Sequence, residues 1–434
     1  MLKMKAEVCV ESKLSLDGAN VNNLVTSAAQ GHWTAGLLAE LLNQYQQQVL
    51  NEYLGSKYRL KRQHEFGCTY CRSTQLVRRG SRPRQIKTSL GIITFRLYQL
   101  SCRFCRSTFS PFIERLGFDR RQRIACELEL KLIDLAKDIS YKRSADKVKQ
   151  LLNVNVSTCS VYNVVKRRAN RLDFKNTVNP PFILFDSTKV RLNTKIKGDD
   201  VNVVVGINGR YNKDGRPFYD KRIMALNCAR PWKELTPYLA DKRPDYVMCD
   251  GDHVVDHMIN SLYPQSVRQW CLWHVPRSLY FRTMWQDKLA WRKRLRWIER
   301  LRHILQDYSA DMPNADKRLD QYINDLERIG LPETVRFLKA YRIHFWGYKT
   351  QVQKDLQKKF KSPKPLIASG VIERFIREIK RRSRVGVRWS EQGLTRLLKI
   401  KLIAEYNKTQ YQAIWNFDLK GPKHALLNVK ISYC

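Results

Sequence analysis

The pattern of hydrophobic and polar positions changes several times along the chain, and each change marks a different kind of segment. Residues 1–60 contain WTAGLLAELLNQYQQQVLNEYL, whose apolar positions recur at helical spacing and predict one amphipathic helix that packs or dimerises. Residues 61–112 hold the strand-like run IITFRLYQL between two cysteine pairs. Residues 113–175 return to helical spacing. The first part of the chain therefore predicts three segments in succession.

From residue 180 the pattern becomes typical of β-strands. The runs FILFD, VNVVVGIN, DKRIMALNC, DYVMCD and SVRQWCLWH are strand candidates within residues 180–274. Residues 275–365 revert to helical spacing and are rich in Arg, Lys and Trp. After the breaker KSPKP, a strong helix begins near Ser369 within residues 366–410, whereas residues 411–434 form a tail with little signal. We therefore expect a mixed α/β fold whose core is interrupted by an all-α insertion.

The charge of the chain indicates a polyanionic partner. It has 80 Lys and Arg residues against 40 Asp and Glu residues, which gives a formal net charge of +40. Repulsion of this size destabilises a compact protein unless a polyanion offsets it. Because 43% of the residues are hydrophobic, the chain can form real cores and is not a disordered basic tail. Double-stranded DNA is the expected partner.

Membrane and secretion signals are not expected. No run of residues approaches the roughly 18 apolar positions of a membrane span. The start, MLKMKAEVCVESKL, lacks the apolar core of a signal peptide. We expect a cytoplasmic, nucleoid-associated protein.

Two Cys-x-x-Cys pairs predict a metal site. Each pair presents two thiolates from one tight turn, and two facing turns complete a tetrahedral site for one structural Zn²⁺ ion. A strand-like run leading into the second pair suits a zinc ribbon, and neighbouring arginines could clamp DNA. The alternative is that the thiols are simply buried. The four candidate zinc ligands are Cys68, Cys71, Cys102 and Cys105.

The segment SADKVKQLL–NVNV–STCSVYNVVKRRA has the length and period of a helix-turn-helix. Ser144 and Ser157 are the expected N-caps of its two helices. The expected inward positions are Ala145, Val148, Leu151 and Leu152 on the first helix and Val161, Val164 and Val165 on the second. An ordinary helical hairpin with a solvated basic face is the alternative. If the motif reads DNA, the outward residues available to it are Thr158, Ser160, Asn163, Lys166 and Arg167.

Three carboxylates are candidates for a catalytic metal site. Asp186 ends the apolar run FILFD and Asp250 ends DYVMCD, where an acid is costly unless it binds a cation or hydrogen-bonds. Glu373 lies on VIERFIREIKRRSR, on a face that also carries Arg377, Lys380, Arg381 and Arg384. Three carboxylates amid cations could hold two divalent ions for phosphoryl transfer on DNA.

Each of these carboxylates has an ordinary structural alternative. Asp186 could cap a turn, and Asp250 could start a loop in which Asp252 is a rival ligand. Glu373 could form a surface ion pair with Arg377. The pair formed by Cys271 and His274 is too small for a metal site by itself, and we expect it to support the strand by local hydrogen bonds.

The order of these residues resembles that of DDE transposases, most closely the Mutator-like transposases of bacterial insertion sequences. The matching pattern is Asp186, then Asp250, then Cys271-x-x-His274, a helical insertion, and Glu373. The resemblance implies an RNase H-like core and a catalytic triad of these three acids, which would bind two Mg²⁺ or Mn²⁺ ions. Many relatives have Ser-Asn shortly before the glutamate, whereas this chain has SGVIE at residues 369–373.

The expected function is that of a DNA transposase. The zinc ribbon and helix-turn-helix would bind the terminal inverted repeats of the element. The core would hydrolyse a phosphodiester to free a 3′-hydroxyl and then direct it at target DNA. Pairing two element ends requires a homodimer or a larger synaptic assembly. The alternatives are a non-catalytic DNA-binding regulator derived from a transposase and a nuclease of the same fold.

The helical insertion carries four tryptophans among many cations. Most of them are expected to be core residues of a helical bundle. One of them could instead stack on an unpaired base near the cleavage site. The four candidates are Trp285, Trp291, Trp297 and Trp346.

Overall fold

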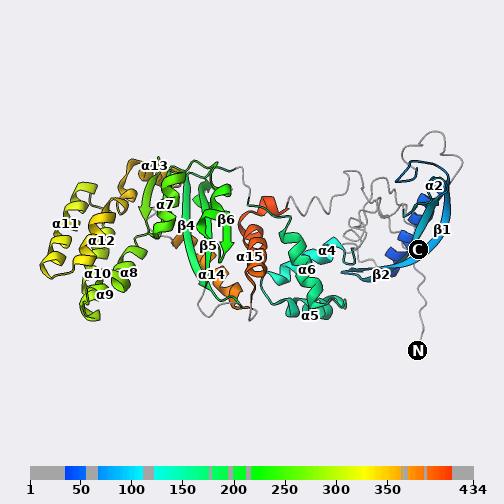
Figure 1. Cartoon of the computed structure of the whole chain (residues 1–434), viewed down its shortest axis with the longest axis horizontal. Helices are drawn as coiled ribbons and strands as arrows, with labels where there is room; N and C mark the ends of the chain where they lie inside the picture. Colours follow the sequence, from blue (N-terminus) through cyan, green and yellow to red (C-terminus); the bar gives the residue numbers. More distant parts are fainter. Residues whose placement is uncertain are drawn as a thin grey trace, which may run out of the picture. The chain divides into compact units, whose positions relative to one another are not determined.

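The computed structural model forms two compact units, which are described separately. It describes residues 35–54, 67–110, 122–174, 178–193, 199–211, 217–362, 365, 370–385 and 389–412. The first unit comprises residues 1–167 and 409–434, and the second comprises residues 168–408. Ser369 and almost all of the expected tail lie outside the described residues. The fold is mixed α/β, as expected from the sequence (Figure 1).

The first unit contains a three-stranded antiparallel sheet in the order β1-β2-β3. Its strands are β1 (Leu76–Thr88), β2 (Gly91–Cys102) and β3 (Thr108–Phe109). The run IITFRLYQL is confirmed as part of β2. Residues 78–87, RRGSRPRQIK, are a basic stretch without the sequence pattern of a strand, yet they lie within β1. Most of β1 is exposed on both faces, so its sequence lacks the alternation that identifies a strand.

Helix α2 (Ala35–Leu54) packs on β2. Its buried residues join the core of the sheet: Leu38, Leu42 and Leu50. The side chain of Asn43 accepts a hydrogen bond from the backbone N–H of Arg96 at 3.1 Å, and that of Gln46 accepts one from Tyr98 at 3.5 Å. These two N–H groups belong to the stretch of β2 that β3 leaves uncovered, so α2 satisfies part of an open strand edge.

Three short helices complete the described part of the first unit: α4 (Cys126–Ala136), α5 (Tyr141–Leu152) and α6 (Thr158–Ala169). Ser157 caps α6 as expected, because its hydroxyl accepts from the Ser160 N–H at 3.1 Å. The expectation for α5 was wrong. The helix begins one turn earlier and is capped by Ser140, whereas Ser144 is buried inside it. Leu151 is also not inward, since it is 69% exposed. The inward positions of α6 are confirmed as buried: Val161, Val164 and Val165.

The second unit is built on a five-stranded sheet in the order β6-β5-β4-β7-β8. The strands are β4 (Phe182–Val190), β5 (Asp199–Tyr211), β6 (Pro217–Cys228), β7 (Tyr246–Cys249) and β8 (Val267–Trp270). The first three pair antiparallel, whereas β7 pairs parallel with both β4 and β8. All five strand candidates are confirmed.

Two strand ends differ from the sequence expectation. β4 continues past Asp186 to Val190, because β5 pairs with it along its whole length. β8 ends at Trp270, and the following CLWH forms a turn into a helix. Between β6 and β8 lie the short helix η2 (Trp232–Tyr238) and α7 (His253–Leu262).

The expected helical stretch follows β8. It contains α8 (His274–Ser278), the π-helical turn η3 (Leu279–Thr283), α9 (Met284–Gln286), α10 (Trp291–Leu305), α11 (Met312–Arg328), α12 (Pro332–Tyr341), η4 (Arg342–His344), η5 (Gly347–Lys349) and α13 (Gln351–Lys359). Its core is continuous with one face of the sheet, since Phe185 and Val247 belong to the same buried cluster as Leu301 and Leu319.

Trp270 joins β8 to this helical stretch. Its ring is buried and stacks on Tyr341, with centroids 4.6 Å apart, and on His344, with centroids 5.3 Å apart. Its indole N–H donates to Asp256 of α7 at 3.3 Å. The end of the sheet and the helical stretch therefore share an aromatic cluster centred on Trp270.

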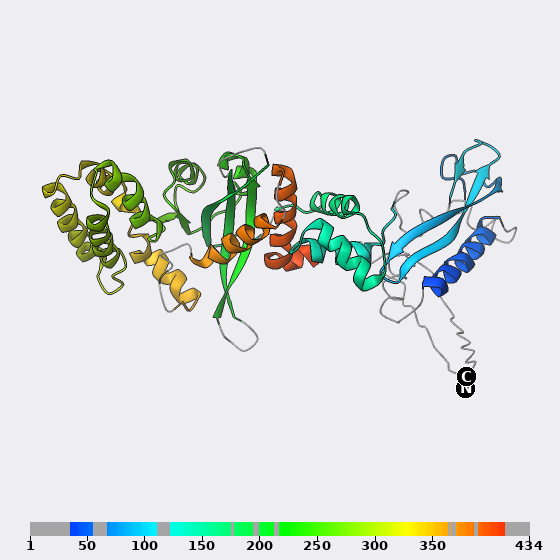
Figure 2. The same cartoon turned by 90° about the horizontal axis from the view of Figure 1, so that it is seen from below.

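Two helices follow, α14 (Gly370–Arg384) and α15 (Glu391–Tyr406). α14 contacts β4, and α15 contacts β6 (Figure 2). The helix near Ser369 is confirmed as α14, but α15 was not expected. The residues of α15 are buried on most sides of the helix, and even Lys401 is buried. Its sequence therefore does not separate into an apolar face and a polar face. No helix among the described residues is long and apolar enough to cross a membrane.

Candidate active site

Asp186 lies on β4, and Asp250 directly follows the adjacent parallel strand β7 at the equivalent position. The ladder between β4 and β7 ends at the pair Leu184 and Met248, and each aspartate follows that pair by two residues. Side chains alternate between faces along a strand, so both carboxylates share the face of their preceding pair. That face is opposite the one that packs on the helical stretch, to which Phe185 contributes. The sheet thus brings the first two predicted acids together.

Asp186 is buried, and burial also affects the ionisation of Asp250. Asp186 is 8% exposed and accepts a hydrogen bond from the Ser187 N–H at 2.8 Å. Asp250 accepts one from the Asp252 N–H at 3.1 Å, but burial raises the pKa of Asp250 above its ordinary value. Asp252, the rival ligand, caps α7 by accepting from the N–H groups of Val254 and Val255.

Gly251 makes the turn after Asp250 possible. Its φ of +86° lies in the left-handed region, and an added Cβ would lie 2.8 Å from the buried ring of Trp270. A side chain at this position would therefore be strained and would collide with a fixed ring. The glycine lets the chain leave β7 and start α7 while Asp250 stays at the strand end.

Cys271 and His274 lie beside the aspartates, at a turn and not on the strand where they were expected. The Cys271 N–H donates to the Cys249 carbonyl at 2.8 Å, and His274 is the first residue of α8. A hydrogen bond with Cys271 raises the pKa of His274 to about 9, against the effect of burial, and the charges of Asp186 and Asp250 add to the rise. The imidazole is thus a cation close to both acids.

Glu373 lies in the first turn of α14, which packs on β4. The buried residues of this helix are Ile372, Phe375 and Ile379, and none belongs to the cluster on the opposite face of the sheet. Glu373 is exposed and, within the described residues, forms no ion pair with Arg377. The expected cationic face is confirmed as exposed: Arg377, Lys380, Arg381 and Arg384.

The three acids are not as close as the ligands of a single ion. Among the described His, Cys, Asp and Glu residues, the only group of three or more whose ligand atoms all lie within 4.8 Å of one another is formed by four cysteines. The three predicted acids therefore do not form a closed ligand set in the described structure.

The four predicted cysteines form that closed set. Cys68 and Cys105 have their sulfurs 3.6 Å apart, and those of Cys71 and Cys102 are 3.5 Å apart. A tetrahedral Zn²⁺ with Zn–S bonds of about 2.3 Å would place its sulfurs about 3.8 Å apart. The thiols therefore fit a metal ion such as zinc. Their two turns lie at the start of β1 and at the end of β2.

The two cysteine turns have the same local conformation. Arg72 and Arg106, which follow the second cysteine of each pair, have positive φ of 61° and 57°. The N–H of Cys68 donates to the Ser73 carbonyl and that of Cys102 to the Ser107 carbonyl, each at 2.9 Å. The Ser107 hydroxyl also bonds the Cys105 sulfur at 2.9 Å and lowers the pKa of Cys105 to about 6, which favours a thiolate. Sequence spacing did not identify Ser107.

The outward side of α6 is mostly available to a ligand. Thr158, Asn163 and Lys166 are exposed, whereas Ser160 is half-buried and bonds the hydroxyl of Ser157. Arg167 forms an ion pair with Glu129, which is buried. Part of the Arg167 guanidinium is therefore occupied within the protein.

Comparison with known families agrees with this arrangement. The family model described as "Transposase, Mutator family" matches residues 13–413. The match spans nearly the whole chain, so the chain is a transposase. It belongs to the Mutator family of transposases. A search of curated proteins found no match.

Proposed function

We propose that this transposase is of the DDE type: it binds the terminal inverted repeats of its element, hydrolyses a phosphodiester there and transfers the freed strand to target DNA. The observation that carries the proposal is that Asp186 and Asp250 each follow the last pair of the ladder between β4 and β7 by two residues. Glu373 on α14, which packs against β4, supplies the third acid. Three antiparallel strands followed by two parallel ones support an RNase H-like core.

The acids would hold two Mg²⁺ or Mn²⁺ ions, which when bound would activate the attacking oxygen and stabilise the leaving one. Carboxylate oxygens are the ligands that these hard cations prefer. Burial raises the pKa of Asp250, and a bound cation would stabilise its charged form. Two-metal sites hold ions about 3.5–4 Å apart, so their outer ligands need not form one tight cluster. His274 would hold a proton beside Asp186 and Asp250 and reduce their repulsion.

Separate elements would bind the DNA. We assign one structural Zn²⁺ to the four cysteines, as a zinc ribbon, and a helix-turn-helix to α5 and α6. The cationic face of α14 would bind phosphates near the cleavage site, through Arg377, Lys380 and Arg381. A homodimer or larger assembly in the cytoplasm, on the nucleoid, would pair two element ends.

The test is cleavage of DNA that carries the ends of the element. With Mg²⁺ we expect a nick that leaves a 3′-hydroxyl, followed by strand transfer, and loss of both in Asp186→Asn and Glu373→Gln. Asp200→Asn is the matched control, because Asp200 is a more exposed acid of the same sheet. Specific binding without cleavage would instead identify a regulator, and cleavage without strand transfer a nuclease.

A further inference from the structure

A groove of about 700 Å³ lies between α10 and the turns that follow the sheet. We call it the Trp273 groove. Trp273 is 68% exposed and Phe281, on the π-helical turn η3, is 63% exposed. The lining residues that matter are Trp273, Arg277 and Phe281 on one side and Leu295, Arg296 and Arg302 on α10.

The exposed rings of this groove differ from the aromatic core beside it. Trp297 packs edge-on against Tyr322, and Trp346 is 5% exposed with its indole N–H on Asp316 at 2.9 Å. Trp346 is therefore a core residue and Trp297 is partly buried against the core. Trp285 and Trp291 are 65% and 58% exposed, so the expectation that most of the four tryptophans are core residues is wrong. Trp273 and Phe281 lie outside this core and present their rings to solvent. Large exposed rings in a concave surface mark a site for a ligand with a flat face.

The charge of the Trp273 groove fits a nucleotide. The Arg277 guanidinium lies 6.0 Å from the centre of the Phe281 ring. In the described part of the chain, Arg277 and Arg296 have no carboxylate partner, whereas Arg302 pairs with Glu299 at 3.3 Å. Two cations therefore remain for phosphates beside two rings for a base, the combination that binds single-stranded nucleic acid.

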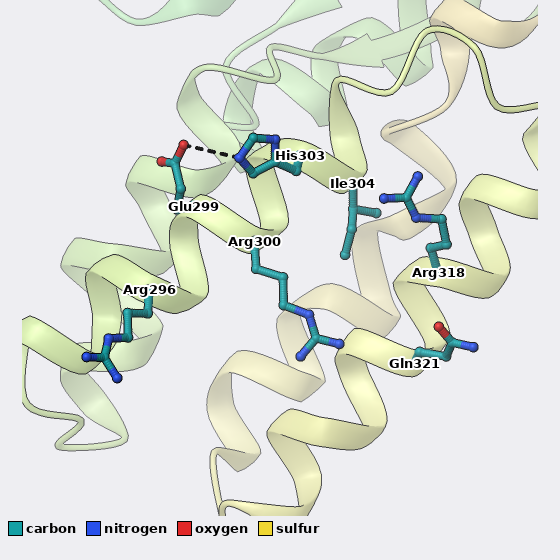
Figure 3. A pocket seen from close by; sticks show the side chains of 7 residues that line it. All are labelled: Arg296, Glu299, Arg300, His303, Ile304, Arg318 and Gln321. Atoms are coloured by element: carbon teal, nitrogen blue, oxygen red, sulfur yellow. Dashed lines mark ion pairs between the residues drawn. The ribbon is translucent and has the colours of Figure 1, made fainter.

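A second groove on α10 lacks this combination. It has a volume of about 510 Å³, and Figure 3 shows its lining side chains, none of which is a Phe, Tyr or Trp. Arg300 pairs with Asp325 at 2.6 Å, Arg318 pairs with Asp307, and His303 lies 3.5 Å from Glu299. Carboxylates already pair with Arg300 and Arg318. Arg296 lines both grooves, so the second groove has one arginine without a carboxylate partner among the described residues, and it has no Phe, Tyr or Trp ring beside it. It is therefore the poorer site for a nucleotide.

The Trp273 groove is linked to the candidate active site through the turn that follows β8. Trp273 directly precedes His274 in the chain. The charge of His274 interacts with both Asp186 and Asp250. A nucleotide in the groove would therefore be near DNA bound at the two acids.

We propose that the Trp273 groove holds an unpaired base of the DNA end being processed, stacked on Trp273 and Phe281, with Arg277 and Arg296 on its phosphates. The proposal rests on the proposed function, because it requires DNA at Asp186 and Asp250. Holding one base out of the duplex would fix the end of the strand relative to the acids.

The test compares two DNA probes on the full-length protein. One is a duplex with a short single-stranded overhang that carries 2-aminopurine, and the other is a blunt duplex with the same number of phosphates. Stacking of one base changes affinity on the order of 10- to 100-fold. We expect the overhang to bind more tightly by this factor with quenched fluorescence. Trp273→Ala and Phe281→Ala should remove the preference, and Trp273→Phe should keep most of it.

Trp291→Ala is the matched control, because Trp291 is 58% exposed on α10 but does not line the groove. A thermal melt of each variant checks its fold. Equal binding of both probes by the wild type, or an equal loss in the Trp291 variant, would overturn the proposal. If overhang binding depends on Trp273 but element ends are never cleaved, the result supports base binding in the Trp273 groove and contradicts the proposed function.

Discussion

Asp186 and Asp250 follow the same ladder pair, burial raises the pKa of Asp250, and the charges of both acids raise the pKa of His274. One imidazolium cannot neutralise two carboxylates and a third acid from α14. Without bound cations, the negative charge of this site is therefore only partly compensated, which destabilises the protein. Binding of cations, free or together with DNA, would remove this destabilisation. Stability and ligand binding should be coupled at this point of the fold.

We expect Asp250→Asn to stabilise the cation-free protein at neutral pH. Burial raises the pKa of Asp250 in the folded state, so the stability that its protonated form provides at low pH is lost as the pH rises through that pKa. The amide carries no such cost. Calorimetry should show a melting temperature higher on the order of 2–4 °C for each kcal/mol gained.

The same variant should lose the response to divalent cations. Millimolar MgCl₂ should raise the melting temperature of the wild type and of Asp200→Asn, but not of Asp250→Asn. An unchanged magnesium response in Asp250→Asn would show that this carboxylate does not bind the ion.

The sequence predicted both aspartates because an acid after an apolar run is costly in any fold. It did not predict their shared register, which depends on how β4 pairs with β7. It also assigned the cap of α5 to Ser144 instead of Ser140, because both serines precede apolar positions at helical spacing. The sequence also did not identify Trp273 as a candidate, because the exposure of a tryptophan depends on the tertiary structure.

At the scale of elements, α6 combines outward side chains with an internal ion pair. Lys166 and Arg167 are neighbours, yet only Arg167 contacts Glu129 of α4. The strand β1 shows the same limit of sequence analysis, because its partner β2 supplies the buried face and its own residues look like a basic loop.

We predict that Arg167→Ala lowers the stability of the protein, whereas Lys166→Ala affects only DNA binding. Loss of Arg167 leaves the buried Glu129 without this partner and should lower the free energy of unfolding by about 1–3 kcal/mol. Loss of Lys166 should leave stability unchanged and weaken DNA binding. Urea denaturation and a DNA-binding titration of both variants measure this, and equal stability losses would contradict it.

We predict that Cys68→Ser and Cys102→Ser each abolish zinc binding, because each removes one of four ligands from a closed set. Metal analysis of the purified proteins measures the zinc content. Cys159→Ser is the control, since Cys159 is an exposed cysteine outside the cluster. Full zinc occupancy in both ligand variants would refute the site.

At the scale of the whole molecule, the net charge of +40 is the dominant property. It should appear as a steep salt dependence of DNA binding. Each phosphate contacted contributes a slope of roughly −0.9 to the logarithm of affinity against the logarithm of salt concentration. Titrations at several salt concentrations measure that slope, and a shallow one would mean that the charge serves another purpose.

The contact of Trp270 with Tyr341 and His344 has an evolutionary consequence. The helical stretch that follows β8 packs against the end of this strand, next to the turn that carries Cys271. Recombination that exchanged the insertion with that of a distant element would leave this ring without its stacking partners. The insertion and β8 should therefore be inherited as one block, with substitutions at these three aromatic positions compensating for one another.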